Sequence, residues 1–232
     1  RYSSSAASDV YKRQLEFSPR QRRENLSAFR ANMPLSWAVF RNYDAHAKEI
    51  GGDVTDYPRF FLMPESCHSE SDSEGMNVIR LGHPTDHVDH EVELVIRLGE
   101  GLKPDLMCVG CDTTNRTRQG LAKQNSWPWL EGKSFVGSAV LGTWTEYDPR
   151  PKRITLSVNG ELRQDSNTNL MVHSVDTLIG TLANWYGASP GDYLWTGTPV
   201  GVGKMEPGDL IECTMENTDG LLVSRMIGKC VI

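Results

Sequence analysis

The chain has 232 residues, a formal net charge of −6 at pH 7 and 38% hydrophobic residues, enough for one globular domain with a sizeable core. The acidic balance and the lack of clustered lysine and arginine argue against nucleic acid as a partner. No apolar run approaches the ~20 residues that a membrane span needs, so we expect a small-molecule partner and no membrane contact.

The N-terminal residues have an unusual sequence. Residues 4–14 resemble the in-frame translation of a common sequencing adapter. We therefore predict three regions, which are a non-native segment at residues 1–14, a polar and basic flank at residues 15–35, and a folded domain at residues 36–232.

A short helix is predicted at residues 44–50, after a strand at residues 36–40 and before a pair of glycines. The spacing of three residues places His46 and Glu49 on one helical face. A carboxylate beside an imidazole fixes its tautomer and raises its basicity, which suits a general base that activates water. The alternative is a solvent-exposed helix pair, and spacing alone leaves both interpretations open.

Residues 90–98 form a β-rich run with two carboxylates, Glu91 and Glu93. Because side chains alternate along a strand, both project from the same face. They could lie on the solvated face of an amphipathic strand. However, Asp112 follows a second short apolar piece, and three carboxylates from two neighbouring strands would make an all-oxygen pocket for Mg²⁺ or Mn²⁺.

The five cysteines are odd in number and irregularly spaced, which fits a reducing compartment better than a disulfide framework. We therefore expect a cytoplasmic protein, or a mitochondrial one if the source is eukaryotic.

Two local patterns in the second half of the chain predict scaffold. Asn159 and Gly160 separate two β-rich runs and predict a hairpin with a type I′ turn. Ser174 is typical of a helix N-cap, and the apolar residues after it follow the helical period as far as Gly187.

Residues 197–203 are rich in glycine and follow a predicted strand. They do not form a dinucleotide loop, because such a loop opens a helix and this one leads through a turn into another strand. The glycines instead let backbone approach a ligand closely, with Thr198 offering hydroxyl and amide donors.

Six motifs in order resemble the fumarylacetoacetate hydrolase family, within it the small acylpyruvate hydrolases and oxaloacetate decarboxylases. They are RNYDAH at 41–46, HEVEL at 90–94, Asp112 with Arg116 and Gln119, GKSF at 132–135, VNGELRQ at 158–164, and TGTPVGVG at 196–203. The resemblance implies a mixed β (α+β) fold, a β-sandwich or β-roll with few short helices. It also implies a homodimer and a catalytic domain at residues 36–232.

The resemblance also implies roles for the candidate site residues. Glu91, Glu93 and Asp112 would hold one divalent ion, Mg²⁺ or Mn²⁺. His46 would be the base with Glu49 as its orienter, on a mobile lid helix. Lys133 would add a positive charge at the reacting oxygen, and the substrate's polar ends would be held by Arg116, Gln119 and Thr198.

The expected function is therefore metal-dependent hydrolysis of a C–C bond in acylpyruvate-type 2-oxo acids, with oxaloacetate decarboxylation as a further activity. One alternative is an isomerase or decarboxylase of unsaturated dicarboxylates from aromatic degradation. Another is a non-catalytic metal-binding relative.

Overall fold

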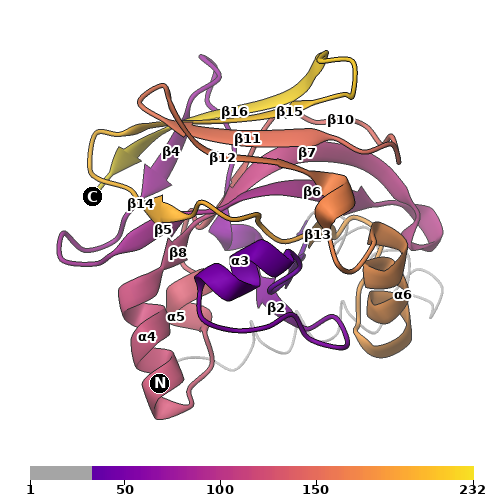
Figure 1. The fold of residues 1–232 in the computed structure, drawn as a ribbon, viewed down its shortest axis with the longest axis horizontal. Helices are drawn as coiled ribbons and strands as arrows, with labels where there is room; N and C mark the ends of the chain where they lie inside the picture. Colours follow the sequence, from indigo (N-terminus) through magenta and orange to yellow (C-terminus); the bar gives the residue numbers. More distant parts are fainter. Residues whose placement is uncertain (1–32) are drawn as a thin grey trace, which may run out of the picture.

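The computed structural model describes residues 33–232, which fold into three β-sheets with four α-helices beside them (Figure 1). The adapter-like residues 1–14 and most of the predicted flank lie outside the described residues, so the three-region division stays a prediction. In the part of the chain that the structure describes, no helix is long and apolar enough to cross a membrane.

The largest sheet has eight strands in the order β2-β1-β13-β6-β7-β9-β3, with β10 also paired to β7. It is mixed, because β1 runs parallel to β13 and β3 parallel to β9 while the other pairs are antiparallel. Its strands are β1 (Ser36–Val39), β2 (Phe60–Met63), β3 (His68–Ser69), β6 (Val92–Leu98), β7 (Pro104–Asp112), β9 (Ala139–Leu141), β10 (Thr145–Glu146) and β13 (Tyr193–Trp195).

Two smaller sheets complete the β-structure. The five-stranded sheet has the order β12-β11-β15-β16-β4, and the three-stranded sheet the order β14-β5-β8. Their strands are β4 (Asn77–Arg80), β5 (Val88–His90), β8 (Thr114–Asn115), β11 (Arg153–Val158), β12 (Glu161–Asn167), β14 (Gly203–Lys204), β15 (Leu210–Glu216) and β16 (Leu222–Val231). The helices are α3 (Asp44–Glu49), α4 (Arg116–Asn125), α5 (Leu130–Lys133) and α6 (Val175–Trp185), with short 3₁₀ turns η1 (Glu65–Cys67), η2 (Glu100–Leu102) and η3 (Thr168–Leu170).

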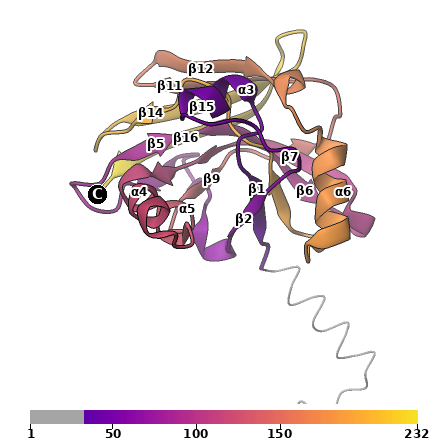
Figure 2. The same cartoon turned by 60° about the horizontal axis from the view of Figure 1, so that its bottom comes forward.

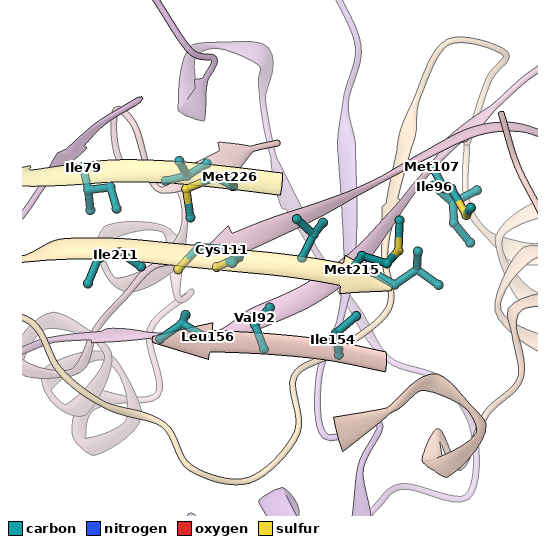
Figure 3. Packing of buried hydrophobic residues seen from close by; sticks show 14 of the residues in the cluster. Ile79, Val92, Ile96, Met107, Cys111, Ile154, Leu156, Ile211, Met215 and Met226 are labelled. Carbon is teal, nitrogen blue, oxygen red and sulfur yellow. The ribbon is translucent and has the colours of Figure 1, made fainter. Parts of the chain in front are cut away.

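The main core lies between the eight-stranded and five-stranded sheets, which Figure 2 shows as stacked layers. Strands β11 and β15 bury alternate residues and leave the others partly exposed, whereas β6 is buried on both faces. On one face of β6, Val92 and Ile96 belong to the cluster that includes Leu156 (Figure 3), and on the other face Val95 packs with Trp195. The predicted mixed β fold with few short helices is confirmed.

The two local scaffold predictions are also confirmed. Asn159 and Gly160 have φ values of 51° and 81°, the pair of positive angles that a type I′ turn requires, and they join β11 to β12. The Ser174 hydroxyl accepts a hydrogen bond from the backbone N–H of Thr177 at 3.2 Å and caps α6.

The β-rich run predicted at residues 90–98 is interrupted in the structure. Residues 88–90 belong to the three-stranded sheet, the eight-stranded sheet begins again at Val92, and Glu91 lies between them. The break arises because the chain changes sheets at this point.

Gln164, a fully buried side chain on β12, stabilises this break. Its Oε1 accepts from Val92 N at 3.0 Å and from His90 Nδ1 at 3.2 Å, while its Nε2 donates to Thr198 Oγ1 and Pro199 O, both at 2.9 Å. One amide therefore joins the five-stranded sheet to both the strand break and the glycine loop.

The Gln164→Leu substitution should lower the free energy of unfolding by about 2–5 kcal/mol, because it leaves several buried polar groups without partners. Urea denaturation measures the change. The matched control is Gln124→Leu at an exposed position of α4, where a change below about 0.5 kcal/mol is expected. Equal effects of the two substitutions would show that the Gln164 amide has no special structural role.

Candidate metal centre

Three carboxylates meet where β6 and β7 lie side by side. Glu93 pairs with Gly110 across the two strands, and Asp112 N donates to Glu91 O at 2.9 Å at their end. Each of the three residues offers a carboxylate oxygen, and these atoms lie within 4.8 Å of one another. All three side chains are buried. The structure therefore brings together Glu91, Glu93 and Asp112, the predicted metal ligands.

Two buried or half-buried cations offset this negative charge. Lys133 at the end of α5 donates from Nζ to Glu91 Oε2 at 2.8 Å and to Asp112 Oδ2 at 2.7 Å. Arg116, the first residue of α4, donates from Nη2 to Glu91 Oε1 at 2.6 Å. Unpaired buried anions cost several kcal/mol each, so these contacts allow the triad to be buried.

The three carboxylates differ in acidity because their neighbours differ. Burial acts to raise the pKa of Glu91, but the charges of Lys133 and Arg116 outweigh it and hold that pKa at about 2. Burial raises the pKa of Asp112 to about 6 despite Lys133. Burial and the charges of Asp112 and Glu91 raise the pKa of Glu93 well above its usual value.

The triad fits a hard divalent cation. Its donors are all oxygens, which Mg²⁺ and Mn²⁺ prefer. Asp112 Oδ1 is buried and has no hydrogen-bond partner among the residues described. A buried carboxylate oxygen without a partner is unfavourable in a protein interior, and a cation bound there would satisfy it.

Arg116, which was predicted to bind substrate, also pairs with carboxylates of the protein itself. Besides Glu91, it donates from Nε to Asp89 Oδ2 at 2.7 Å and from Nη1 to Gln119 Oε1 at 3.2 Å. Asp89 Oδ1 in turn lies 2.6 Å from His87 Nε2. Sequence reasoning missed Asp89, although its spacing of two residues before Glu91 continues the alternation of acids along this stretch.

The predicted histidine base and its neighbouring glutamate lie together on α3. His46 Nδ1 lies 3.0 Å from Glu49 Oε2, and the His46 side chain is buried while Glu49 is partly exposed to solvent. Glu49 Oε1 accepts from Gly201 N at 3.0 Å, which docks α3 on the glycine loop. The same loop reaches the triad, because Gly197 N donates to Glu93 Oε2 at 2.7 Å.

Asn42, two residues before the start of α3, is a second residue that sequence reasoning missed. Its side chain is fully buried and donates from Nδ2 to Thr196 O at 2.9 Å and to His173 O at 3.0 Å, while its Oδ1 accepts from His173 N at 2.7 Å. It therefore fixes the start of the helix to the end of β13. Only its place in the RNYDAH motif pointed to it.

Almost all the predicted site residues line a single pocket. It encloses about 440 Å³ between protein atoms, including space open to solvent. Glu49 is the one predicted residue that does not line it, but its carboxylate contacts His46, which does. The predicted residues on its wall are His46, Glu91, Glu93, Asp112, Arg116, Gln119, Lys133 and Thr198.

Sequence comparison identifies known proteins that are similar to this chain. The family model described as fumarylacetoacetate (FAA) hydrolase C-terminal matches residues 36–230. The mitochondrial oxaloacetate decarboxylase of Dictyostelium discoideum is 33% identical over 196 residues, which is 78% of this chain and 88% of that protein. An oxaloacetate tautomerase of Escherichia coli is 33% identical over 195 residues, 77% of this chain and 86% of that protein.

Structure comparison agrees with the sequence match. The crystal structure of fumarylpyruvate hydrolase from Pseudomonas aeruginosa, in complex with Mn²⁺ and pyruvate, has a TM-score of 0.77 and 30% sequence identity. The similarity covers 85% of this chain and 89% of that one. With most of its length matched by the family model, the chain belongs to the fumarylacetoacetate hydrolase family.

Proposed function

We propose that the protein is a divalent-metal-dependent hydrolase that cleaves a C–C bond in acylpyruvate-type 2-oxo acids. The observation that carries this proposal is the buried triad of Glu91, Glu93 and Asp112 in the same pocket as the His46–Glu49 pair. The Mn²⁺ and pyruvate of the fumarylpyruvate hydrolase structure support it. Mg²⁺ and Mn²⁺ both suit the oxygen donors.

A divalent ion held by the triad would act as a Lewis acid toward the carboxylate and keto oxygens of a 2-oxo acid. Lys133 keeps its proton, because the charges of Asp112 and Glu91 outweigh burial and raise its pKa. Its ammonium group therefore adds positive charge where enolate charge develops during cleavage.

His46 is proposed as the general base. The hydrogen bond from Nδ1–H to Glu49 fixes the tautomer, and Nε2 is then the nitrogen that accepts a proton from water. The activated water attacks the distal carbonyl, the C–C bond breaks with its electron pair leaving as the enolate of pyruvate, and the enolate carbon then takes up a proton. Glu49 orients the ring and, through Gly201, keeps the helix against the pocket.

The substrate's polar ends meet three candidate groups. Thr198 Oγ1 accepts from Gln164, so its own hydroxyl proton is free to donate to substrate. Arg116 has five N–H groups and uses three of them on Asp89, Glu91 and Gln119. Two donors are left for a substrate carboxylate.

A second candidate activity is decarboxylation or tautomerisation of oxaloacetate, favoured by the names of the Dictyostelium and Escherichia relatives. A panel of acylpyruvates, oxaloacetate and unsaturated dicarboxylates, assayed with Mg²⁺ and with Mn²⁺, separates these activities from the isomerase alternative. Pyruvate release is the readout for hydrolysis, and absence of any turnover would favour a non-catalytic metal-binding protein.

The homodimer and the compartment stay predictions. Light scattering at several protein concentrations tests the dimer. The Dictyostelium relative is named as mitochondrial, while the expectation for this chain is cytoplasmic or mitochondrial.

The Glu93→Gln substitution should reduce the affinity for Mn²⁺ at least tenfold, because it removes one of three anionic ligands while keeping the side-chain volume. Isothermal titration calorimetry measures this. Glu100→Gln, at an exposed position outside the pocket, is the matched control and should leave the affinity unchanged. Wild-type affinity in the Glu93 variant would contradict the proposed ligand set.

Metal affinity should also depend on pH. Asp112 has a raised pKa of about 6, so below that pH it binds a proton that the metal must displace. Glu93, whose pKa is also raised, competes for protons in the same way, so the apparent affinity should rise with pH, by roughly tenfold per pH unit for each ligand that is protonated. Calorimetry between pH 5 and 8 checks this, and an affinity independent of pH over that range would show that no ligand titrates there.

His46→Ala should reduce acylpyruvate hydrolysis by a factor of roughly a hundred to ten thousand, the usual contribution of a positioned general base. Oxaloacetate decarboxylation has no nucleophile to deprotonate and should lose less, whereas Lys133→Ala should impair it strongly. Both reactions are measured with metal occupancy verified. Equal losses of both activities in the His46 variant would indicate that the helix only closes the pocket.

A further inference from the structure

Four side chains form a continuous rim on the more exposed part of the pocket wall, and we call them the cationic rim. Arg41 Cζ lies 5.6 Å from the centroid of the Phe40 ring, and this ring packs edge-on against Trp129 with centroids 5.6 Å apart. Lys123 Nζ lies 5.3 Å from the centroid of the Trp129 ring. All four residues line the same pocket as the metal centre.

The charges of the rim differ from those at the metal centre. Arg116 and Lys133 are paired with carboxylates. Within residues 33–232, by contrast, neither Arg41 nor Lys123 forms an ion pair, and Arg41 makes only a long hydrogen bond of 3.4 Å to Asp53 O. Among the described residues, the rim therefore presents two positive charges that are not paired with a carboxylate.

The position of Arg41 is defined by the surrounding backbone. Its φ of 57° lies in the left-handed region, which is uncommon for a residue with a side chain. A Cβ on Gly52, just after α3, would overlap the Arg41 guanidinium, so glycine at that position leaves the space that the guanidinium fills. Strained backbone that persists in a fold often marks a functional site.

Lys123 lies in an electropositive environment. Partial burial lowers its pKa, and so do the nearby charges of Arg116, Arg41 and Lys133. The aromatic faces of Phe40 and Trp129 attract these cations but do not neutralise them. An anion bound at the rim would relieve the mutual repulsion.

We propose that the cationic rim is a subsite for a second carboxylate, at the end of the substrate distant from the metal. The preferred substrates are then 2-oxo acids that end in a carboxylate, rather than those with a neutral acyl chain. This inference rests on the proposed function, because it places the 2-oxo acid end at the metal centre. Phe40 and Trp129 would flank the carbon chain between the two ends.

The binding test compares two six-carbon ligands in the presence of Mg²⁺, 2-oxoadipate with a distal carboxylate and 2-oxohexanoate without one. The wild-type protein should bind the diacid at least tenfold more tightly, since a hydrogen bond to a charged group is worth that much or more. Lys123→Met should reduce this preference to about threefold or less, and Lys123→Arg should restore most of it. Lys229→Met, an exposed lysine on β16 outside the pocket, is the charge-matched control and should keep the full preference.

The catalytic test compares an acylpyruvate that ends in a carboxylate with its methyl ester at that end. Lys123→Met should reduce kcat/KM for the acid about tenfold more than for the ester, mainly through KM. Equal reduction for both substrates would overturn the subsite, as would equal binding of the two six-carbon ligands, or binding of neither, by the wild type.

The two proposals fail in different ways. Preferential binding of the diacid that depends on Lys123, without pyruvate release from any acylpyruvate, would retain the rim and reject the hydrolytic reaction. Pyruvate release without a preference for the distal carboxylate would retain the reaction and reject the rim.

Discussion

The burial of three carboxylates between two paired strands is the constraint on which the rest of the site depends. Each buried anion would be strongly unfavourable alone, so the fold supplies cations at short distance. Lys133 contacts Glu91 and Asp112, and Arg116 contacts Glu91. Both cations come from α4 and α5, which follow β7 and the short strand β8 directly in the chain. Within residues 33–232, Glu93 has no cation in ion-pair contact, and the charge that remains on the triad is what a divalent ion would balance.

A layer of buried polar side chains holds this charged centre in place. Gln164 joins the five-stranded sheet to the strand break beside Glu91, and Asp89 holds the guanidinium of Arg116. Asn42 attaches the start of α3 to the end of β13. Buried polar groups must be satisfied, and each of these side chains bonds to groups from a different part of the chain. The five-stranded sheet therefore helps to position the site as well as covering the core.

Local features of the sequence predicted local structure well. The hairpin turn and the Ser174 cap depend on a few adjacent residues, and the mixed β class followed from motifs spread over the chain. The pairing of Arg116 with its partners could not be predicted, because it depends on how β5, β8 and the start of α4 come together. The same holds for Gln164, which bonds to Val92 at a separation of 72 residues. Asp89 is different, because the spacing of acids on alternate residues already marked it.

Two residues of the rim, Phe40 and Arg41, belong to the same segment of the chain as the proposed base His46. Arg41 precedes α3 and its guanidinium packs at Gly52, so the beginning and the end of the α3 segment meet at this side chain. Glu49 connects the same helix to the glycine loop. A distal carboxylate bound by Arg41 would therefore hold the helix that carries His46. Binding energy from a part of the substrate that does not react can position a catalytic group in this way. The distal end of the substrate would then influence the rate of cleavage as well as the affinity.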